Sequence, residues 1–371
     1  MISSTEGFAL LEGMWNRLLS VSQANNYFLR WEWLWNWWHV FNTPGDRLAI
    51  LVVEEGDEAV AIAPFYAKKS LAGGILPARL LMFLGTQDGP EGDVGSDYMD
   101  IICKEGAEGA VIDAVFEYIA VNNLCDEIFL SKVAASSNAY GLIMEKGDAM
   151  GFLTEVANEF ISPYIKLPSS WDDYLGSLSA SMRYKIRNER RKLQRSHQAV
   201  FSKARRAEDL GLFLGELIKL HQSRWTSKGM EGAFSNQKFV EFHERVLPIM
   251  LKNGHLDLIL LSDNGIIRGA IYNIVYNDKI YFYQSGIDVE KSAVSYGFVL
   301  HSHCIEDAIQ RGLKEYDFLP KGGTDDYKER YTNGLRRVSD IYMALSRPVK
   351  YCVAAKKGAR LAYRLIKPVR N

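Results

Sequence analysis

Residues 257–331 read DLILLSDNGIIRGAIYNIVYNDKIYFYQSGIDVEKSAVSYGFVLHSHCIEDAIQRGLKEYDFLPKGGTDDYKERY and begin with apolar runs separated by turn signals. The predicted strands are Leu258–Leu261, Ile266–Tyr276 and Lys279–Ser285. Asp263-Asn264-Gly265 and Asn277-Asp278 are typical of tight turns, so adjacent strands should pair antiparallel. This part of the chain therefore predicts a three-stranded antiparallel sheet.

A helical pattern and one more strand follow. Ser295–Arg311 has helical spacing with Gly312 as the stop, and Glu315–Leu319 is a short, mostly apolar run. A strand, a helix and a strand of this length can form one right-handed parallel crossover. The helix would then begin beside the carboxyl ends of two strands, where its amides can bind phosphate oxygens.

Several motifs in and before this region occur in the order expected of a known family. They are His221-Gln222-Ser223-Arg224-Trp225, Gly229, Gly232-Ala233-Phe234, Tyr283-Gln284-Ser285-Gly286-Ile287-Asp288, Ser295-Tyr296-Gly297, Tyr316-Asp317-Phe318-Leu319 and Tyr327-Lys328. Over residues 175–335 they resemble acetyltransferases associated with cellulose biosynthesis, the CelD/BcsL-like family. That family is similar to the wider GNAT fold and to the Fem-type peptidyltransferases, which place two such domains in one chain. The resemblance implies acyl transfer to an amine.

The donor implied by the resemblance is a coenzyme A thioester, either acetyl-CoA or a longer acyl-CoA. Typical members carry Arg or Gln, two residues, Gly, any residue, then Gly or Ala, whereas this chain has a single glycine, Gly297, at that site. Helix-start amides can still hold a pyrophosphate; alternatively, Gly297 only eases the helix entry. The expected cofactor-binding residues are Gln284, Ser285, Ser295, Tyr296, Gly297 and Phe298.

Amide formation requires a base for the amine and hydrogen-bond donors for the carbonyl oxygen. Candidate bases are His221, Asp317 and Glu315; the two carboxylates alternate with aromatic residues and should point to the same side of a strand. We predict that Asp317 positions or deprotonates the acceptor, and that Asp317→Asn abolishes turnover without unfolding the protein. His221 is the second catalytic candidate, with a packing role as the alternative, and Tyr327 is the proposed proton donor to the leaving group.

Acceptor binding is assigned to residues of both halves of the chain. The expected substrate-binding residues are Arg224, Trp225, Asp97, Lys321 and Lys328. Ser96-Asp97-Tyr98 resembles a block in the first half of the family, although its loop could equally be a solvated connection. For Lys328 and Tyr327 the alternative is an exposed helical turn. No metal site is expected.

The first half repeats the α/β order of the second without a strict sequence repeat. Strands are predicted at Arg47–Glu54, Ala59–Tyr66, Leu80–Leu84, Tyr98–Cys103, Glu127–Leu130 and Phe152–Val156, and helices at Ala107–Val121 and Ala139–Lys146. Pro163 and Pro168 place the expected boundary near Ser162–Ser170. The predicted fold is an α/β protein with two GNAT-like domains in tandem, residues 1–165 and 166–346, each a mixed, mainly antiparallel sheet flanked by helices. A basic helical tail, residues 347–371, follows.

A tryptophan-rich segment lies near the start of the chain. Trp31, Trp35 and Trp38 fall at helical spacing, while Trp33 and Trp37 form a second stripe. Packing against the first sheet is the ordinary role for such residues, and a platform for a sugar or lipid acceptor is the alternative.

Two segments are strongly basic. Residues 183–206 hold ten Lys or Arg residues against Glu189, a local charge of +9, so the remainder of the chain sums to −10 for a net charge of −1. We predict one amphipathic helix entering this run, and either a solvated face or a surface for a nucleotide cofactor, a lipid-linked sugar, a membrane or tRNA. The tail 347–371 has eight Lys or Arg residues and no acid, which suits peripheral membrane contact or packing on the second domain.

The remaining properties indicate a cytoplasmic enzyme, with the inner membrane face as a possible peripheral location. The sequence contains no run of about 18 apolar residues that would suggest a membrane span. The four cysteines do not have the spacing of a zinc site; they are Cys103, Cys125, Cys304 and Cys352. The leading function is acyl-CoA-dependent transfer of an acetyl or longer acyl group to a small or glycan-linked amine, in polysaccharide or cell-envelope biosynthesis. An aminoacyl-tRNA-dependent Fem-type peptidyltransferase and a non-catalytic module of polysaccharide assembly are the alternatives.

Overall fold

The computed structural model describes residues 1–87, 94–195, 198–290, 292–320 and 328–366. The described chain forms two compact units, one made of residues 1–87, 94–159 and 337–366 and the other of residues 160–336. This division differs from the predicted boundary, because the chain passes between units inside strand β8 (Leu153–Lys166). Pro163 does not end this strand, since its carbonyl still accepts a hydrogen bond from the Phe318 amide.

The first unit holds two sheets. The larger contains β1 (Arg47–Leu48), β4 (Phe65–Ala72), β5 (Leu76–Phe83), β7 (Glu127–Ala134) and β14 (Gly334–Ala344), and the smaller contains β2 (Leu51–Glu55), β3 (Glu58–Ala63) and β6 (Ile102–Cys103). Its helices include α1 (Thr5–Ala9), α2 (Glu12–Ser20), α3 (Trp31–Phe41), α4 (Glu108–Val121), α5 (Asn138–Ala149) and α11 (Arg347–Ile366). The strands β5 and β7 pair parallel, and the other recorded pairs in this unit are antiparallel.

Several strand predictions for the first half were wrong in extent. The run Arg47–Glu54 divides between the two sheets, as β1 pairs with β4 and β2 pairs with β3. The run Tyr98–Cys103 is a strand only at its end, because Tyr98 has a φ of 58°, in the left-handed region that interrupts extended backbone. The tryptophan-rich segment is the predicted helix, α3, and it packs in the core, with Trp33 and Trp37 fully buried.

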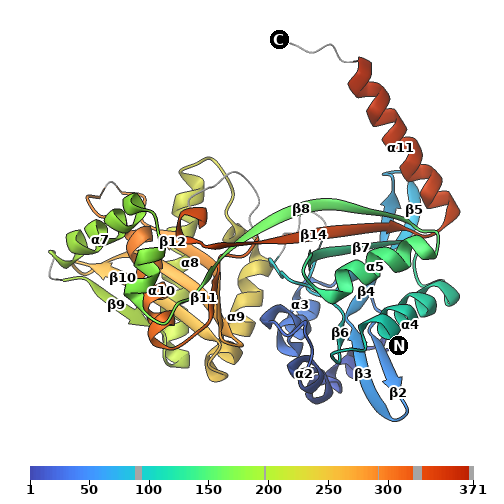
Figure 1. The fold of residues 1–371 in the computed structure, drawn as a ribbon, viewed down its shortest axis with the longest axis horizontal. Helices are drawn as coiled ribbons and strands as arrows, with labels where there is room; N and C mark the ends of the chain where they lie inside the picture. The colour runs from blue at the N-terminus through green and yellow to red at the C-terminus, as the bar shows by residue number, and fades with distance from the viewer. Residues whose placement is uncertain (88–93, 196–197, 291, 321–327, 367–371) are drawn as a thin grey trace. The chain divides into compact units, whose positions relative to one another are not determined.

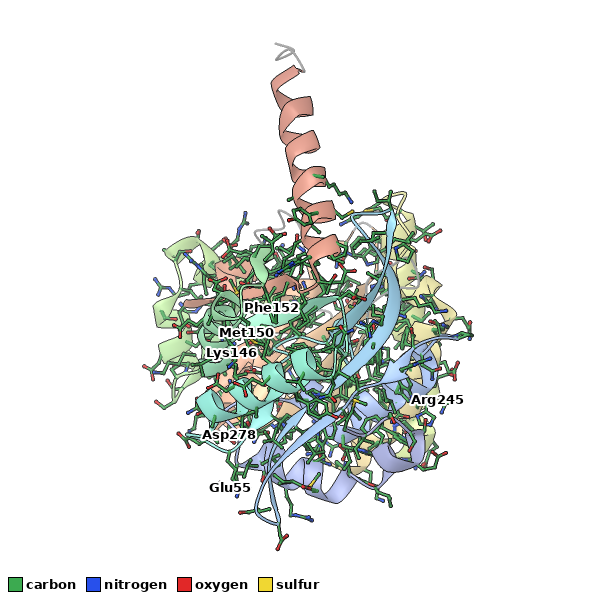
Figure 2. All side chains as sticks on the ribbon, turned by 90° about the vertical axis from the view of Figure 1, so that its right-hand side faces the viewer. Glu55, Lys146, Met150, Phe152, Arg245 and Asp278 are labelled. Atoms are coloured by element: carbon green, nitrogen blue, oxygen red, sulfur yellow. The ribbon has the colours of Figure 1, made fainter. Side chains whose placement is uncertain are left out.

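Side-chain contacts between helices also order the first unit. Lys146 on α5, labelled in Figure 2, pairs with Asp113 and Glu117 of α4 at 2.7 and 3.0 Å. The tail forms the predicted helix over Arg347–Ile366, and Lys350 donates to the Gly151 carbonyl at 2.6 Å. Among the helices in the described ranges, none is long and apolar enough to cross a membrane.

The second unit contains the region with which the sequence analysis began. Its strand order is β8, β13 (Glu315–Asp317), β12 (Lys279–Ile287), β11 (Ile266–Tyr276), β10 (Leu256–Asp263) and β9 (Val200–Lys203). The pairs β10–β11 and β11–β12 are antiparallel and β12–β13 is parallel, which confirms the predicted three-stranded sheet and crossover. Its helices are α6 (Trp171–Ser177), α7 (Ala180–Gln194), α8 (Leu210–Thr226), α9 (Gln237–Lys252) and α10 (Tyr296–Gln310).

Helices cover both faces of this sheet. Helices α7 and α10 lie side by side, and α8 packs on β11 and β12 (Figure 1). The core between α7, α10 and the sheet is apolar and includes Ile186, Phe282, Val299 and Ile305. The single helix predicted through the basic run was wrong: α6 ends at Ser177, α7 is capped by the Ser179 hydroxyl, which accepts from the Met182 amide, and the run ends as strand β9.

Candidate functional site

The parallel strands β12 and β13 separate after a short contact. Their pairing extends only from Lys279–Tyr281 on β12 to Glu315–Asp317 on β13, whereas β12 continues to Ile287. A β-bulge also interrupts the pairing of β12 with β11, because Tyr272 lies opposite Gln284 while Asn273 lies opposite Phe282. The extra residue is Tyr283, and such bulges re-aim the side chains that follow them.

The bulge decides which β12 side chains reach the crossover helix. The Tyr283 hydroxyl lies 3.2 Å from Nε2 of His243 on α9, and Gln284 hydrogen-bonds to His221 on α8. Ser285 and Ile287 line a cavity with the start of α10. The prediction that Gln284 binds the cofactor is therefore corrected, since the bulge turns its side chain toward α8.

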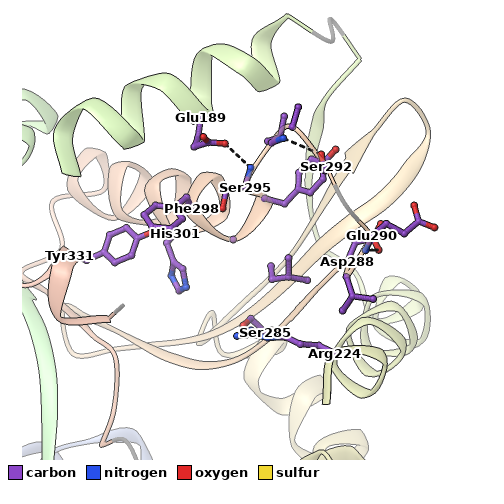
Figure 3. A pocket seen from close by; sticks show the side chains of 16 residues that line it. Glu189, Arg224, Ser285, Asp288, Glu290, Ser292, Ser295, Phe298, His301 and Tyr331 are labelled. Carbon is purple, nitrogen blue, oxygen red and sulfur yellow. Dashed lines mark hydrogen bonds between the residues drawn. The ribbon is translucent and has the colours of Figure 1, made fainter. Parts of the chain in front are cut away.

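The cavity has a volume of about 440 Å³. Figure 3 shows Ser285 and Arg224 on one side, Glu189 and Ser295 on the opposite side, and His301 and Tyr331 at one end. The predicted cofactor-binding residues that line it are Ser285, Ser295, Tyr296, Gly297 and Phe298. The departure of β12 from β13 and the crossover helix thus bring together five of the six predicted residues.

A carboxylate caps the helix start on the cavity wall. The Ser295 amide donates to Oε2 of Glu189 at 2.7 Å, and Lys192 pairs with the other carboxylate oxygen at 2.7 Å. Burial alone would raise the pKa of Glu189, but the bonds from Lys192 and Ser295 outweigh it, so the pKa lies below its usual value. Glu189 therefore stays ionised, and its negative charge interacts favourably with the positive end of the α10 helix dipole. The amides of Tyr296 and Gly297, the first two helical residues, have no acceptor within the helix and line the cavity.

Two glycines near the cavity serve different purposes. A Cβ added at Gly286 would lie 2.6 Å from the His221 backbone nitrogen and 2.8 Å from the Leu217 carbonyl oxygen, so Gly286 allows α8 to lie directly on β12. A Cβ at Gly297 would meet only Ile287, at 3.7 Å, an ordinary contact. Packing therefore requires glycine at 286 but not at 297.

Gly286→Ala should destabilise the second unit by about 3 kcal/mol, because the new methyl forces the α8 backbone away from the sheet. The matched variant Gly297→Ala should lose less than about 1 kcal/mol. Urea unfolding of both variants, followed by circular dichroism, measures the difference. Equal stabilities would show that α8 does not need this close approach.

His301 is a site residue that the sequence analysis missed. It lines the cavity, its ring centroid lies 4.7 Å from that of Phe282, and its Nδ1 lies 3.4 Å from the Tyr316 hydroxyl. Burial, followed by the nearby charges of Lys328 and Arg224, lowers its pKa to about 3. The imidazole is therefore neutral at physiological pH. His301 follows Gly297 by four residues, so both lie on the same face of the helix, one turn apart. This spacing from a predicted site residue is the sequence signal that identifies His301 as a candidate.

His221 does not line the cavity. Its Nε2 accepts from the Trp225 indole at 3.0 Å, and its Nδ1 lies 3.1 Å from the Gln222 amide oxygen. Burial lowers its pKa, and both ring nitrogens are engaged, which fits a neutral, packing imidazole. The predicted catalytic role of His221 has no support from this arrangement. Of the predicted acceptor-binding pair, Arg224 lines the cavity and Trp225 holds His221.

The structure places Asp317 away from the cavity wall. Its Oδ1 accepts from the Ser162 hydroxyl at 2.9 Å and the Leu319 amide at 2.7 Å, and its Oδ2 accepts from Arg336 at 2.6 Å. Arg336 also binds Glu315, which confirms that the two carboxylates share one side of β13. A fully buried carboxylate held by these three groups serves the packing around β13, so the arrangement gives no support to its assignment as the base.

The remaining predicted residues divide between the units. The Lys328 ammonium donates to the Phe318 carbonyl at 2.8 Å and lies 5.3 Å from the Phe282 ring centroid. Asp97 lies in the first unit, where it is buried, so its loop is not solvated at this residue. Lys321 and Tyr327 lie outside the described residues.

Comparisons with known proteins agree with this geometry. Residues 180–329 match the family model described as an acetyltransferase (GNAT) domain. A crystal structure of FemX is similar at 12% identity, with a TM-score of 0.64, covering 95% of this chain and 98% of that chain. The C-terminal domain of a putative lysylphosphatidylglycerol synthetase from Agrobacterium fabrum is similar at 8% identity, with a TM-score of 0.54, covering 96% and 97%.

A conserved protein of unknown function from Bacteroides thetaiotaomicron VPI-5482 is similar at 11% identity, with a TM-score of 0.52, covering 89% of this chain and 96% of that chain. No curated protein matches the sequence. The narrower resemblance to the CelD/BcsL-like family stays a prediction. The predicted α/β fold, with a mixed sheet flanked by helices, is confirmed, and residues 180–329 are similar to the acetyltransferase (GNAT) domain model.

Proposed function

We propose that the second unit transfers an acyl group from an activated thioester or ester to an amine. The observation that carries this proposal is the cavity where β12 parts from β13, bounded by the first amides of α10. All of the residues that line it, except Tyr331, lie within the range that matches the acetyltransferase model. A strand edge and a helix start facing one cavity supply the hydrogen-bond donors that an acyl donor needs.

The reaction forms one bond and breaks another. The uncharged amine attacks the carbonyl carbon, the amide C–N bond forms, the C–S or C–O bond breaks, and the leaving thiolate or alkoxide takes up a proton. The Ser285 hydroxyl and the Tyr296 and Gly297 amides are the donors placed to stabilise negative charge in the cavity. With a pKa of about 3, His301 orients the amine as a hydrogen-bond acceptor, and the amine proton passes to water.

A coenzyme A thioester is the first candidate donor. An anion at the start of α10 is favoured by the amides of Tyr296 and Gly297. Two lysines of α7 add positive charge there. Lys192 pairs with Glu189, and the Lys185 ammonium lies 3.7 Å from the centroid of the Phe298 ring. The acceptor is a small or glycan-linked amine, and cell-envelope or polysaccharide biosynthesis is the proposed setting.

An aminoacyl ester carried by tRNA is the second candidate donor. Glu189 already accepts the Ser295 amide, so a pyrophosphate at this helix start would meet a carboxylate. That arrangement favours a donor whose phosphates bind elsewhere. A neighbouring fold titled as a putative lysylphosphatidylglycerol synthetase makes transfer of an amino acid a reasonable candidate.

Ligand-induced thermal shift tests where the donor binds. Acetyl-CoA or a longer acyl-CoA at a concentration 100-fold above its dissociation constant should stabilise the wild type by about 2.7 kcal/mol. Gly297→Trp should abolish the shift by filling the cavity, whereas Leu212→Trp, on an exposed position of α8, should retain it. An unchanged shift in Gly297→Trp would exclude this cavity as the donor site.

A further inference from the structure

The hairpin of strands β4 and β5 is joined to helix α11 in the first unit. Side chains on one face of the hairpin form a small apolar core with the first turns of the helix; they include Ala72, Ala78, Val349 and the partly buried Val353. The Cys352 sulfur lies against the hairpin turn, since a Cβ added at Gly73 would lie 2.6 Å from it. Strands and helix therefore form one packed element, and they lie side by side in Figure 1.

The opposite face of the hairpin is exposed. Lys69 lies opposite Arg79 and Leu71 lies opposite Pro77, so these four side chains alternate with those that pack on α11. They line an open hollow of about 680 Å³. Leu71 is 60% exposed, and Ile75, in the turn, is 78% exposed, so two large aliphatic side chains stand in solvent at the end of the hairpin. We call these five residues the hairpin surface.

The hairpin and the helix are strongly basic. Residues 65–83 and 347–366, which span β4, β5 and α11, contain nine Lys or Arg residues and no Asp or Glu. Among the neighbouring acids, Asp126 pairs with Arg79 at 3.1 Å, and the buried Glu127 accepts from the Ser70 hydroxyl. Subtracting these two acids leaves an excess of seven positive charges. A cluster of this kind attracts an anionic partner.

Exposed aliphatic side chains among cations match the surface of an anionic lipid bilayer. Aliphatic groups gain by leaving water for the acyl region, and each Lys or Arg near an anionic surface strengthens binding roughly fivefold. A second copy of the chain would bring the same positive excess against itself, which opposes association through this surface. The sequence pattern pointed to the tail alone for membrane contact, and the structure adds the hairpin that packs on it.

We propose that the hairpin surface and helix α11 together bind an anionic membrane, with Leu71 and Ile75 inserted among the lipid headgroups. The cations of the hairpin and of α11 then lie near the lipid phosphates. This gives the first unit a role of its own, which does not depend on the proposed acyl transfer in the second unit.

Co-sedimentation of the full chain with vesicles tests the proposal. Vesicles of phosphatidylglycerol and phosphatidylcholine in equal amounts should bind the wild type at least about tenfold more tightly than phosphatidylcholine alone, and added salt should weaken this binding. Leu71→Ser/Ile75→Ser should lower the partition coefficient at least about tenfold, because it removes the aliphatic groups that leave water. The control Leu10→Ser/Val121→Ser alters residues that are 86% and 84% exposed in the same unit, and should change it less than about twofold.

A second pair of variants tests the charge. Lys69→Gln/Lys356→Gln should weaken binding to the phosphatidylglycerol vesicles at least about tenfold, since both lysines are exposed on the hairpin and α11. Arg17→Gln/Lys104→Gln removes the same charge from α2 and from the residue after β6, and should change binding less than about twofold. Circular dichroism of all four variants confirms that they fold.

Three results would overturn the proposal: no binding of the wild type to phosphatidylglycerol vesicles, equal binding to charged and neutral vesicles, or equal effects of the hairpin variants and their controls. A wild-type dimer that forms without vesicles, and that Leu71→Ser/Ile75→Ser dissociates, would assign the surface to a second copy and overturn it as well. Acyl transfer to a dissolved amine should be unchanged in Leu71→Ser/Ile75→Ser. Vesicle binding by a wild type that transfers no acyl group would refute the proposed function alone.

Discussion

Asp317→Asn should lower the free energy of unfolding of the second unit by about 3 kcal/mol, because it breaks a buried ion pair. Asn retains an oxygen for the Ser162 hydroxyl and the Leu319 amide, but its amino group would face the Arg336 guanidinium, which needs an acceptor. Arg336 would then lose its ion pair with Asp317 and retain the one with Glu315. The sequence analysis expected the opposite, a folded but inactive variant.

Urea unfolding, with hydrogen exchange of peptides from residues 160–336 as the local readout, measures this loss. Glu315→Gln is the matched control: Glu315 is partly exposed and Arg336 keeps Asp317, so the loss should be under about 1 kcal/mol. A stable, well-folded and inactive Asp317→Asn would restore Asp317 as the catalytic base and contradict its structural assignment.

Acidification should destabilise the second unit through two of its buried histidines, His243 and His301. Burial lowers the pKa of His243 and of His301 to about 3, from an ordinary value of 6.5. Between these values the unfolded chain binds protons that the folded chain does not, so stability falls as the pH falls. Each histidine contributes about 1.4 kcal/mol per pH unit, or about 5 kcal/mol for both between pH 6.5 and pH 4.5.

Comparison of wild type and His301→Gln at the two pH values isolates this effect from the carboxylates. The variant should lose about half of the histidine-linked dependence, because Gln does not titrate, and His243→Gln should do the same. Urea midpoints at pH 6.5 and pH 4.5 provide the measurement. If both variants lose stability on acidification as steeply as the wild type, the histidines are not held neutral in the folded state.

The order of elements could be predicted because local signals agree with the fold. Turn residues at Asp263-Asn264-Gly265 and Asn277-Asp278 separate strands whose apolar content matches burial on both faces, and the structure places β10, β11 and β12 there. Ser179 is the N-cap of α7, so a new helix begins there and the single long helix that was predicted is divided. A serine N-cap is a signal that the sequence contains. Pro163 does not interrupt the chain as expected, because a proline in a strand loses only an N–H group and its carbonyl still pairs.

The site was less accessible to sequence reasoning, since it depends on side-chain direction. Strict alternation could not anticipate the bulge at Tyr283, which sends Gln284 to α8 and Ser285 to the cavity. The partner that neutralises Asp317, Arg336, lies 19 residues further along the chain, and no local pattern links the two. His301 lies beside the apolar stripe of α10, where a histidine is typical of core packing.

The most direct test of the central claim measures whether the protein consumes an acyl donor, and whether this activity depends on the cavity of the second unit. Acyl-CoA and aminoacyl-tRNA should each be incubated with the wild type, Gly297→Trp and Leu212→Trp in a pool of amines. Free thiol, discharged tRNA and new amides are then measured, the last by mass spectrometry. We expect the wild type and Leu212→Trp to consume one donor and form an amide, and Gly297→Trp to lose at least 100-fold in rate. Equal rates in all three proteins, or no amide from either donor, would contradict the assignment of acyl transfer to this cavity.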